Sequence, residues 1–202
     1  WINPSDSNIL INGNDGGANV SMDGGQTWST QMNQPTGQFY RVITDNNYPY
    51  RIYSAQQDSN GITIASQSMG GGFQQGGIGT KHWWSIGSGE SATIAFDKDD
   101  PKYVYTTFFA SMLGEWDRDT RQYRNVRPYP ERVTGEQPKN LKYRANWNGP
   151  VIVSPHDPNQ IYYGSQYLMG STDRGVDWEV LSEDLTRNNK DQQGKGGYPI
   201  SN

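Results

Sequence analysis

Three acidic residues stand in polar, glycine-rich stretches of this 202-residue chain, where their carboxyl groups could take part in chemistry. Asp15 lies in the run NDGG, Asp58 in QQDSN and Glu90 in SGES. A pair of carboxyl groups can act as a general acid and as a base or nucleophile, which is how glycosidic bonds are commonly cleaved. Asp15, Asp58 and Glu90 are therefore the candidate catalytic residues.

Aromatic, amide and guanidinium side chains occur in the same stretches or in similar ones. Tryptophan faces stack on sugar rings, and the amides of Gln and Asn hydrogen-bond to sugar hydroxyls. The residues that we predict to bind a ligand are Gln56, Gln57, Trp83, Trp84, Arg144, Asn146 and Trp147.

A structural role is the alternative for each carboxylate. Turns favour aspartate, so Asp15 would cap its own glycine-rich turn and Asp58 would do the same before Asn60. Glu90 would pair with an arginine, as many loop carboxylates do. The catalytic interpretation therefore depends on whether the fold brings the three residues together.

The pattern that predicts the fold is clearest in residues 151–181. Short β-type segments at Val151–Ser154, Ile161–Ser165, Tyr167–Gly170 and Trp178–Leu181 are separated by Pro, Asp, Asn and Gly, which is typical of a four-stranded antiparallel sheet. A proline turn followed by a strand recurs at Pro4, Pro49, Pro101 and Pro158, a spacing of roughly 40 to 60 residues. We predict an all-β protein, a β-propeller of four-stranded antiparallel blades with about four blades present.

The repeat places the blades at about residues 1–37, 38–88, 89–140 and 141–186, with 187–202 as the connection into a further blade. An open array leaves two blade faces unprotected, so we expect a fragment of a larger propeller. Its remaining blades would lie upstream, downstream or on another subunit.

Each blade is expected to run from an inner strand outwards. The proline turns then share one face, and the second-to-third-strand loops lie on the other face with the crossings between blades. The loops supply Asp15 and Asp58, whereas the crossings supply Trp83, Trp84, Glu90 and the stretch 143–148. This loop face is the predicted site.

An eight-residue pattern, S-x-D-x-G-x-x-W, occurs twice, at residues 21–28 and 171–178. The aspartate can accept N–H groups of its own turn, the glycine can take a positive φ, and the tryptophan starts the next strand as a buried anchor. We interpret these residues as structural: Ser21, Asp23, Gly25, Trp28, Ser171, Asp173, Gly175 and Trp178.

The two patterns resemble the Asp-box, or BNR, repeat of sialidase-type and sortilin-type propellers. Together with QFYRVITDNNYPYRIYSAQQDSNG and LKYRANWNGPVIVSPHDPNQIYYGSQYL, they make the chain similar to a bacterial family of secreted BNR-repeat proteins labelled glycosyl hydrolase or sortilin-like. The resemblance implies a multi-blade propeller related in fold to xyloglucanase-type hydrolases, in an extracellular, periplasmic or cell-surface location. No xyloglucanase catalytic pair can be matched onto this sequence residue by residue.

Composition excludes several other classes of function. The net charge is −4 with Lys and Arg scattered, which argues against a nucleic-acid partner. The chain has no Cys, and His82 and His156 are too few for a metal triad, so we predict no metal and no cofactor. No apolar run is long enough for a membrane span. Two functions remain open: binding or cleavage of a polysaccharide, and a non-catalytic propeller that binds a peptide or serves as a cell-surface scaffold.

Overall fold

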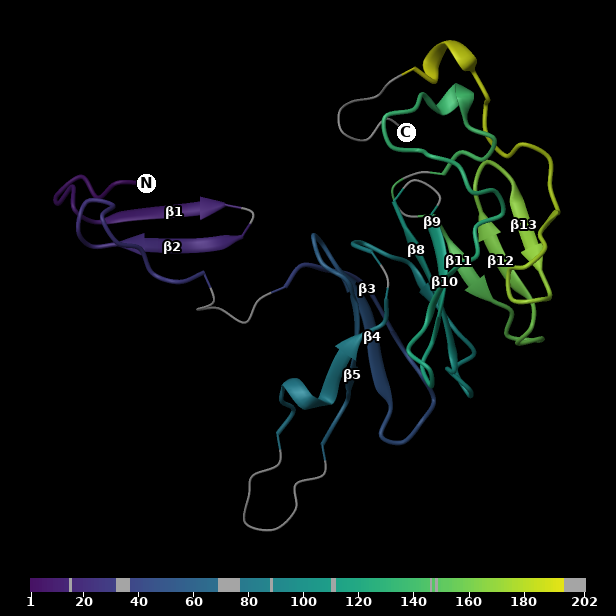
Figure 1. The fold of residues 1–202 in the computed structure, drawn as a ribbon, viewed down its shortest axis with the longest axis horizontal. Helices are drawn as coiled ribbons and strands as arrows, with labels where there is room; N and C mark the ends of the chain where they lie inside the picture. Colours follow the sequence, from purple (N-terminus) through teal and green to yellow (C-terminus); the bar gives the residue numbers. More distant parts are fainter. Residues whose placement is uncertain are drawn as a thin grey trace. The chain divides into compact units, whose positions relative to one another are not determined.

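The computed structural model consists almost entirely of short antiparallel strands joined by turns (Figure 1). It describes residues 1–14, 16–31, 37–68, 77–87, 89–109, 112–145, 147 and 149–194. The chain divides into two compact units, Trp1–Gly37 and Gln38–Asn202, which we call unit 1 and unit 2. In the described ranges no helix is long and apolar enough to cross a membrane.

Unit 2 contains, within its described residues, three four-stranded antiparallel sheets. Blade two is formed by β3 (Phe39–Thr44), β4 (Arg51–Gln56), β5 (Gly61–Ala65) and β6 (Trp83–Ser85). Blade three is formed by β7 (Ile94–Ala95), β8 (Tyr103–Phe108), β9 (Met112–Asp117) and β10 (Tyr123–Asn125). Blade four is formed by β11 (Val151–Val153), β12 (Ile161–Gly164), β13 (Leu168–Ser171) and β14 (Glu179–Val180). These sheets confirm the predicted all-β fold with propeller-type blades.

In each blade the strands follow one another in sequence order, so alternate connections lie at opposite ends of the sheet. The proline turns, β3–β4, β7–β8 and β11–β12, share one end, which we call the turn end. The second-to-third-strand loops and the crossings between blades lie at the other end, which we call the loop end. The described residues also contain three short 3₁₀ helices, η1 (Thr80–His82), η2 (Pro138–Asn140) and η3 (Lys190–Gln192).

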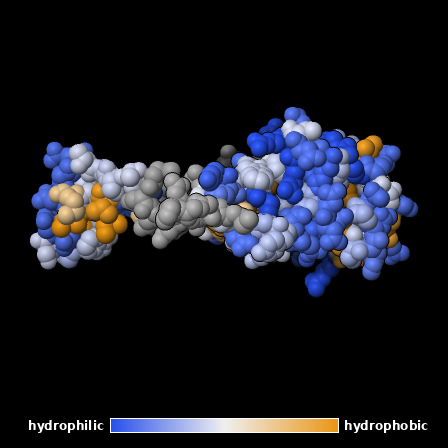
Figure 2. All heavy atoms as spheres, turned by 90° about the horizontal axis from the view of Figure 1, so that it is seen from below, coloured by the Kyte–Doolittle hydropathy of each residue, from blue (hydrophilic) through white to orange (hydrophobic). Residues whose placement is uncertain are grey.

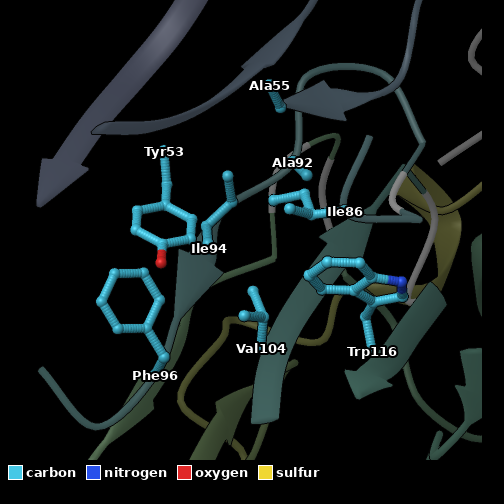
Figure 3. Packing of buried hydrophobic residues seen from close by; sticks show 8 residues of the cluster. All are labelled: Tyr53, Ala55, Ile86, Ala92, Ile94, Phe96, Val104 and Trp116. Carbon is cyan, nitrogen blue, oxygen red and sulfur yellow. The ribbon is translucent and has the colours of Figure 1, made fainter. Parts of the chain in front are cut away.

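The core lies between the blades, on both faces of blade three. Successive residues of a strand point to opposite faces, so Val104 and Trp116 face blade two while Tyr105 and Leu113 face blade four. Figure 3 shows the first of these two layers, which contains Tyr53, Ala55, Ile86, Ala92, Ile94, Phe96, Val104 and Trp116. The second layer contains Ala95, Tyr105, Leu113, Val126, Val151, Ile161, Tyr163 and Met169. Burial of these apolar faces is what holds neighbouring blades together.

Unit 1 departs from the expected four-stranded blade. It has a two-stranded sheet of β1 (Leu10–Asn14) and β2 (Gly17–Ser21), extended by an Ile2–Leu10 bridge and by a backbone hydrogen bond from Ser29 to Val20. Two strands cannot bury an apolar face by themselves. Trp1, Ile2 and Met22 accordingly stay more than half exposed, and Figure 2 shows an apolar patch on this unit.

The two S-x-D-x-G-x-x-W stretches form box turns with matching contacts. Ser171 Oγ donates to Asp173 Oδ1 at 2.8 Å and accepts from the Gly175 N–H at 2.8 Å. Asp173 also accepts from the N–H groups of Val176 and Asp177, which holds the pKa of its carboxyl below the usual value. The first box turn, residues 21–28, repeats the serine contacts at 2.8 and 2.9 Å. Each aspartate is thus engaged inside its own turn.

A buried carboxylate fixes the proline turn of blade two. Asp45 is 3% exposed and accepts hydrogen bonds from the Arg51 N–H at 2.9 Å and the Tyr53 hydroxyl at 2.9 Å. Burial by itself would raise the pKa of Asp45, but the hydrogen bonds from Arg51, Asn47 and Tyr53 outweigh it and lower the pKa. The ionised form is therefore the form that the fold stabilises.

We expect Asp45→Asn to lower the free energy of unfolding at pH 7 by about 1–2 kcal/mol, because hydrogen bonds to a charged acceptor are lost. Since folding lowers this pKa, the contribution is complete above about pH 4 and is lost as the pH falls through the lowered value. Urea unfolding between pH 7 and pH 2.5 tests this. The wild-type and variant curves should converge at low pH, and Asp157→Asn, in the exposed proline turn of blade four, serves as the control. A difference that persists at pH 2.5 would contradict the assignment.

Candidate functional site

Two of the three predicted catalytic residues meet at the loop end of blade two. The Gln57 side-chain amide donates to Asp58 Oδ1 at 2.9 Å and also to Glu90 Oε2. The Asp58 N–H donates to the same Glu90 oxygen at 3.0 Å, and the Tyr40 hydroxyl donates to Gln57 Oε1. Because both carboxylates accept from one amide nitrogen, the accepting oxygens are at most roughly 6 Å apart. We call Gln57, Asp58 and Glu90 the carboxyl cluster.

The backbone around the carboxyl cluster is held in an unusual conformation. Asp58 and Ser91 have φ values of 54° and 57°, in the left-handed region that non-glycine residues seldom adopt. The Ser91 N–H donates to the Gln56 carbonyl at 3.3 Å, which ties the crossing from blade two to blade three against the β4–β5 loop. Ser91 is fully buried, and within the described part of the chain its hydroxyl has no hydrogen-bond partner. Strain of this kind is concentrated at functional sites in proteins.

The electrostatics of the cluster distinguish its two acids. Burial raises the pKa of Glu90, and the neighbouring Asp58 carboxyl raises it further, against the opposing effect of the Asp58 N–H. Two carboxyl groups this close do not ionise independently, so one of them keeps its proton to a higher pH. Asp58 is exposed, whereas Glu90 is half-buried. Of the two acids, Glu90 is therefore the one whose protonated form the fold favours.

An aromatic row begins next to the carboxyl cluster. The Phe108 ring lies so close to Gly89 that a Cβ at that position would be 2.1 Å from a ring carbon. Phe108 contacts Phe109 with ring centroids 4.0 Å apart, and Phe109 stacks on Trp147 at 5.5 Å with an interplanar angle of 20°. All three rings are half-buried. These contacts connect the three rings into one row, and its first member, Phe108, packs against Gly89, the residue before Glu90.

The aromatic row rests on a small core of its own. Val133 and Leu141, both buried in the long crossing from blade three to blade four, pack with Phe109. Trp147 is one of the predicted ligand-binding residues, whereas its partners Phe108 and Phe109 were not predicted. Two consecutive phenylalanines at the end of a strand are a signal that would have indicated them, because one of the two must leave the blade face.

The remaining predicted site residues lie elsewhere or have other partners. Arg144 forms an ion pair with Asp184 at 2.9 Å and a hydrogen bond with Thr186, so its charge is used within blade four. Trp83 and Trp84 were predicted to lie in a crossing between blades. They instead form the outer strand β6, where Trp84 stacks under the Arg51 guanidinium. They do so because both residues pair with strand β5, Trp83 opposite Ile64 and Trp84 opposite Thr63. Asp15 and Asn146 lie outside the described residues.

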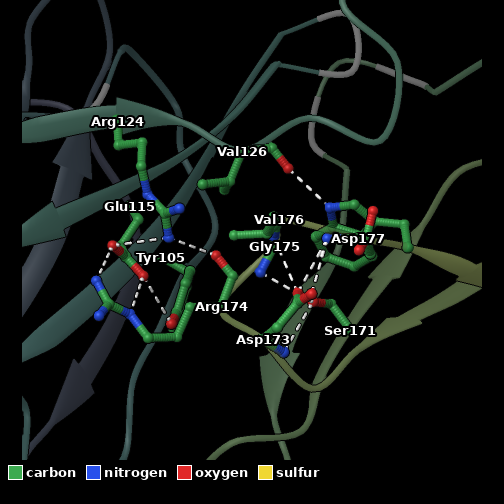
Figure 4. Close-up of polar contacts among 11 residues, drawn as sticks. Tyr105, Glu115, Arg124, Val126, Ser171, Asp173, Arg174, Gly175, Val176 and Asp177 are labelled. Carbon is green, nitrogen blue, oxygen red and sulfur yellow. Dashed lines mark hydrogen bonds and ion pairs between the residues drawn. The ribbon is translucent and has the colours of Figure 1, made fainter.

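A second charged cluster joins blades three and four (Figure 4). Glu115 is 3% exposed and accepts two hydrogen bonds from Arg174, at 2.6 and 3.0 Å, one from Arg124 at 3.2 Å and one from the Tyr105 hydroxyl at 3.0 Å. The Arg174 guanidinium also lies 3.5 Å from the centre of the Tyr103 ring. Each acceptor position of Glu115 is thus engaged by blade three or by the second box turn. We interpret this cluster as an inter-blade clamp, and the sequence analysis did not predict it.

The comparisons with known proteins concern the fold alone. No family model and no curated protein matches the chain. A GH74 enzyme of Niastella koreensis is similar at 17% identity and a TM-score of 0.41, over 89% of this chain. An auxiliary nutrient binding protein and a protein of unknown function, both from Bacteroides thetaiotaomicron, are similar at 10% and 12% identity with TM-scores of 0.45 and 0.44, over 91% and 92% of this chain. The chain spans 28%, 41% and 43% of the three proteins, respectively.

Proposed function

We propose that this chain is part of a secreted Asp-box (BNR) propeller and that it binds a polysaccharide at the loop end of blades two and three. One observation carries the proposal, the aromatic row that begins beside the carboxyl cluster. Sugar rings present apolar faces that stack on aromatic rings, and their hydroxyls need both donors and acceptors. The Gln57 amide and the two carboxyl groups supply both kinds of group.

A secreted location follows from the proposed family rather than from the site. The two box turns have the sequence pattern of the Asp-box repeat, and that repeat is typical of proteins that act outside the cytoplasm. We therefore propose an extracellular, periplasmic or cell-surface location for the chain. Further blades, from the same polypeptide or from another subunit, would complete the ring.

Cleavage of the bound polysaccharide is the second candidate function, and the carboxyl cluster favours it. Retaining glycosidases place an acid and a nucleophile about 5–5.5 Å apart, and the shared amide donor keeps the two accepting oxygens within roughly 6 Å of each other. In this proposal Glu90, with its raised pKa, protonates the leaving oxygen, and Asp58 is the nucleophile. A peptide ligand of a sortilin-like propeller is the alternative to both carbohydrate functions.

Replacing Trp147 with alanine tests the proposed binding. We expect affinity for the preferred polysaccharide to fall at least tenfold, since central aromatic contacts contribute about 2 kcal/mol or more. Affinity electrophoresis on gels containing xyloglucan, hydroxyethylcellulose, laminarin or galactomannan would identify the ligand, and calorimetry would measure the loss.

Trp83→Ala is the matched control, because Trp83 is a 43% exposed tryptophan on the outer strand of blade two. It should leave binding unchanged. Equal losses of polysaccharide affinity in the two variants would overturn the carbohydrate proposal. A wild-type chain that is retarded by none of the polysaccharides but binds peptides from a library would overturn it in favour of the sortilin-like one.

A further inference from the structure

A recess of about 570 Å³ lies at the turn end of blades two and three, the end opposite to the carboxyl cluster. Its walls come from the proline turns of both blades and from the end of β9. The volume is within the range of small-molecule sites, about 300–1,000 Å³. Two arginines, Arg51 and Arg118, line it from opposite blades.

Arg51 is held rigidly by neutral groups. Its guanidinium lies 3.6 Å from the centre of the Trp84 ring, and its N–H groups donate to Thr63 Oγ1, the Thr63 carbonyl and the His82 carbonyl at 3.1, 3.2 and 3.1 Å. These contacts orient the cation without neutralising it. The Asp45 carboxylate attracts Arg51, but no ion pair forms between them among the described residues.

Arg118 is less engaged than Arg51. It follows β9 on the face of Trp116, which is the face that packs against blade two. Its side chain makes one hydrogen bond within the described part of the chain, to the Pro101 carbonyl at 3.4 Å, and no ion pair there. A guanidinium carries five N–H donors, so most donors of Arg118 remain available. Arg51 and Arg118 both line the recess. Burial lowers the pKa of Arg51, and the charge of Arg118 acts in the same direction.

The other charged groups of the recess are at its rim. Lys102 and Asp119 form an ion pair at 3.3 Å, so they largely compensate each other. Asp99 accepts from the Asn46 amide at 2.7 Å, and Asp99 and Asp100 are exposed to water. Three cations, Arg51, Lys102 and Arg118, thus face three carboxylates around the recess. Water screens the exposed Asp99 and Asp100 more strongly than it screens the two half-buried arginines.

We propose that this recess binds an oxyanion, the carboxylate or sulfate group of a small organic ligand, with Arg118 and Arg51 as the donors. Arginine suits this role because its planar donors match the oxygens of a carboxylate or sulfate group. An anion between the two guanidiniums also removes their mutual repulsion. The proposal is independent of the loop-end site, which lies at the other end of the blades.

Titration of the full chain with sodium sulfate and with sodium succinate, at an ionic strength held constant with sodium chloride, tests the proposal. The readout is the NMR signal of the Trp84 indole N–H, assigned with a Trp84→Phe variant, since Arg51 lies on that ring. A saturable shift is expected with at least one of the two anions. Saturation by sulfate or by succinate identifies which oxyanion the recess prefers.

Arg118→Gln should weaken this binding about tenfold or more, because a charge-assisted hydrogen bond is lost. Arg187→Gln, which removes the same charge from an exposed position on the C-terminal segment, should not weaken it. Arg118→Lys keeps the charge and provides a second variant if the glutamine variant does not fold; it should show a smaller loss. The absence of a saturable shift with both anions would overturn the proposal, and so would equal losses in the Arg118 and Arg187 variants.

Discussion

Replacing Arg174 with glycine is expected to lower the free energy of unfolding by about 3 kcal/mol, since it leaves a buried carboxylate with too few partners. Glu115 is 3% exposed and takes two of its four hydrogen bonds from Arg174. The loss of stability comes from Glu115, which stays buried without its main partner. Arg174 is 40% exposed, so burying its charge costs the folded wild type little hydration. The interface between blades three and four would lose its clamp.

Glycine is the right replacement because of the backbone. Arg174 has a φ of 63°, and the first box turn has Gly24 at the equivalent position with a φ of 70°. The backbone of the turn therefore accepts glycine, and only the side-chain contacts are removed.

Arg121→Gly is the control for this prediction, since Arg121 has a φ of 57° in an exposed turn and forms no ion pair within the described residues. Its effect should stay within about 0.5 kcal/mol. Urea unfolding at pH 7 measures both variants. Similar midpoints for the two would show that Glu115 does not depend on Arg174.

Replacing Glu90 with glutamine is expected to abolish any glycosidase activity and to stabilise the fold at neutral pH. A general acid contributes about 10²- to 10⁴-fold to a rate, so hydrolysis should fall by that factor. Polysaccharide binding should persist, because glutamine keeps an oxygen where Glu90 Oε2 accepts both of its hydrogen bonds. Reducing-sugar release measures the first effect and calorimetry the second.

The stability gain has a definite pH dependence. Burial raises the pKa of Glu90 in the folded chain, so the fold favours the protonated form. Its stability contribution is complete below the usual glutamate pKa of about 4.3 and is lost as the pH rises through the raised value. Glu90→Gln should therefore raise the unfolding midpoint at pH 7 and have little effect at pH 3.5.

Glu136→Gln removes an exposed carboxylate from the crossing between blades three and four and serves as the control for both effects. A variant at Glu90 that is less stable than the wild type at pH 7 would contradict the electrostatic account of the cluster. A wild-type chain that binds a polysaccharide without cleaving it would rule out hydrolysis and leave the binding proposal intact.

Local sequence was sufficient to predict the box turns and most strands of unit 2, although not β6. In residues 171–178 each side-chain hydrogen bond of Ser171 and Asp173 joins residues at most four apart, so the residues that make the turn also specify it. The recurring proline turns are also local patterns, and each precedes a strand, such as Ile161–Gly164 with its alternating burial. The blade repeat, and with it the all-β fold, could be read from these short patterns.

The choice of partners for charged and aromatic side chains was decided only by the tertiary structure. Glu115 and Arg174 are 59 residues apart, and Gln57 and Glu90 are 33 apart. Arg144, predicted to bind a ligand, pairs with Asp184. Such pairs depend on which face of each strand points to the next blade and on how closely the blades pack. A pattern of residue types fixes the strands, whereas the packing of their faces decides which charges are paired and which remain available to a ligand.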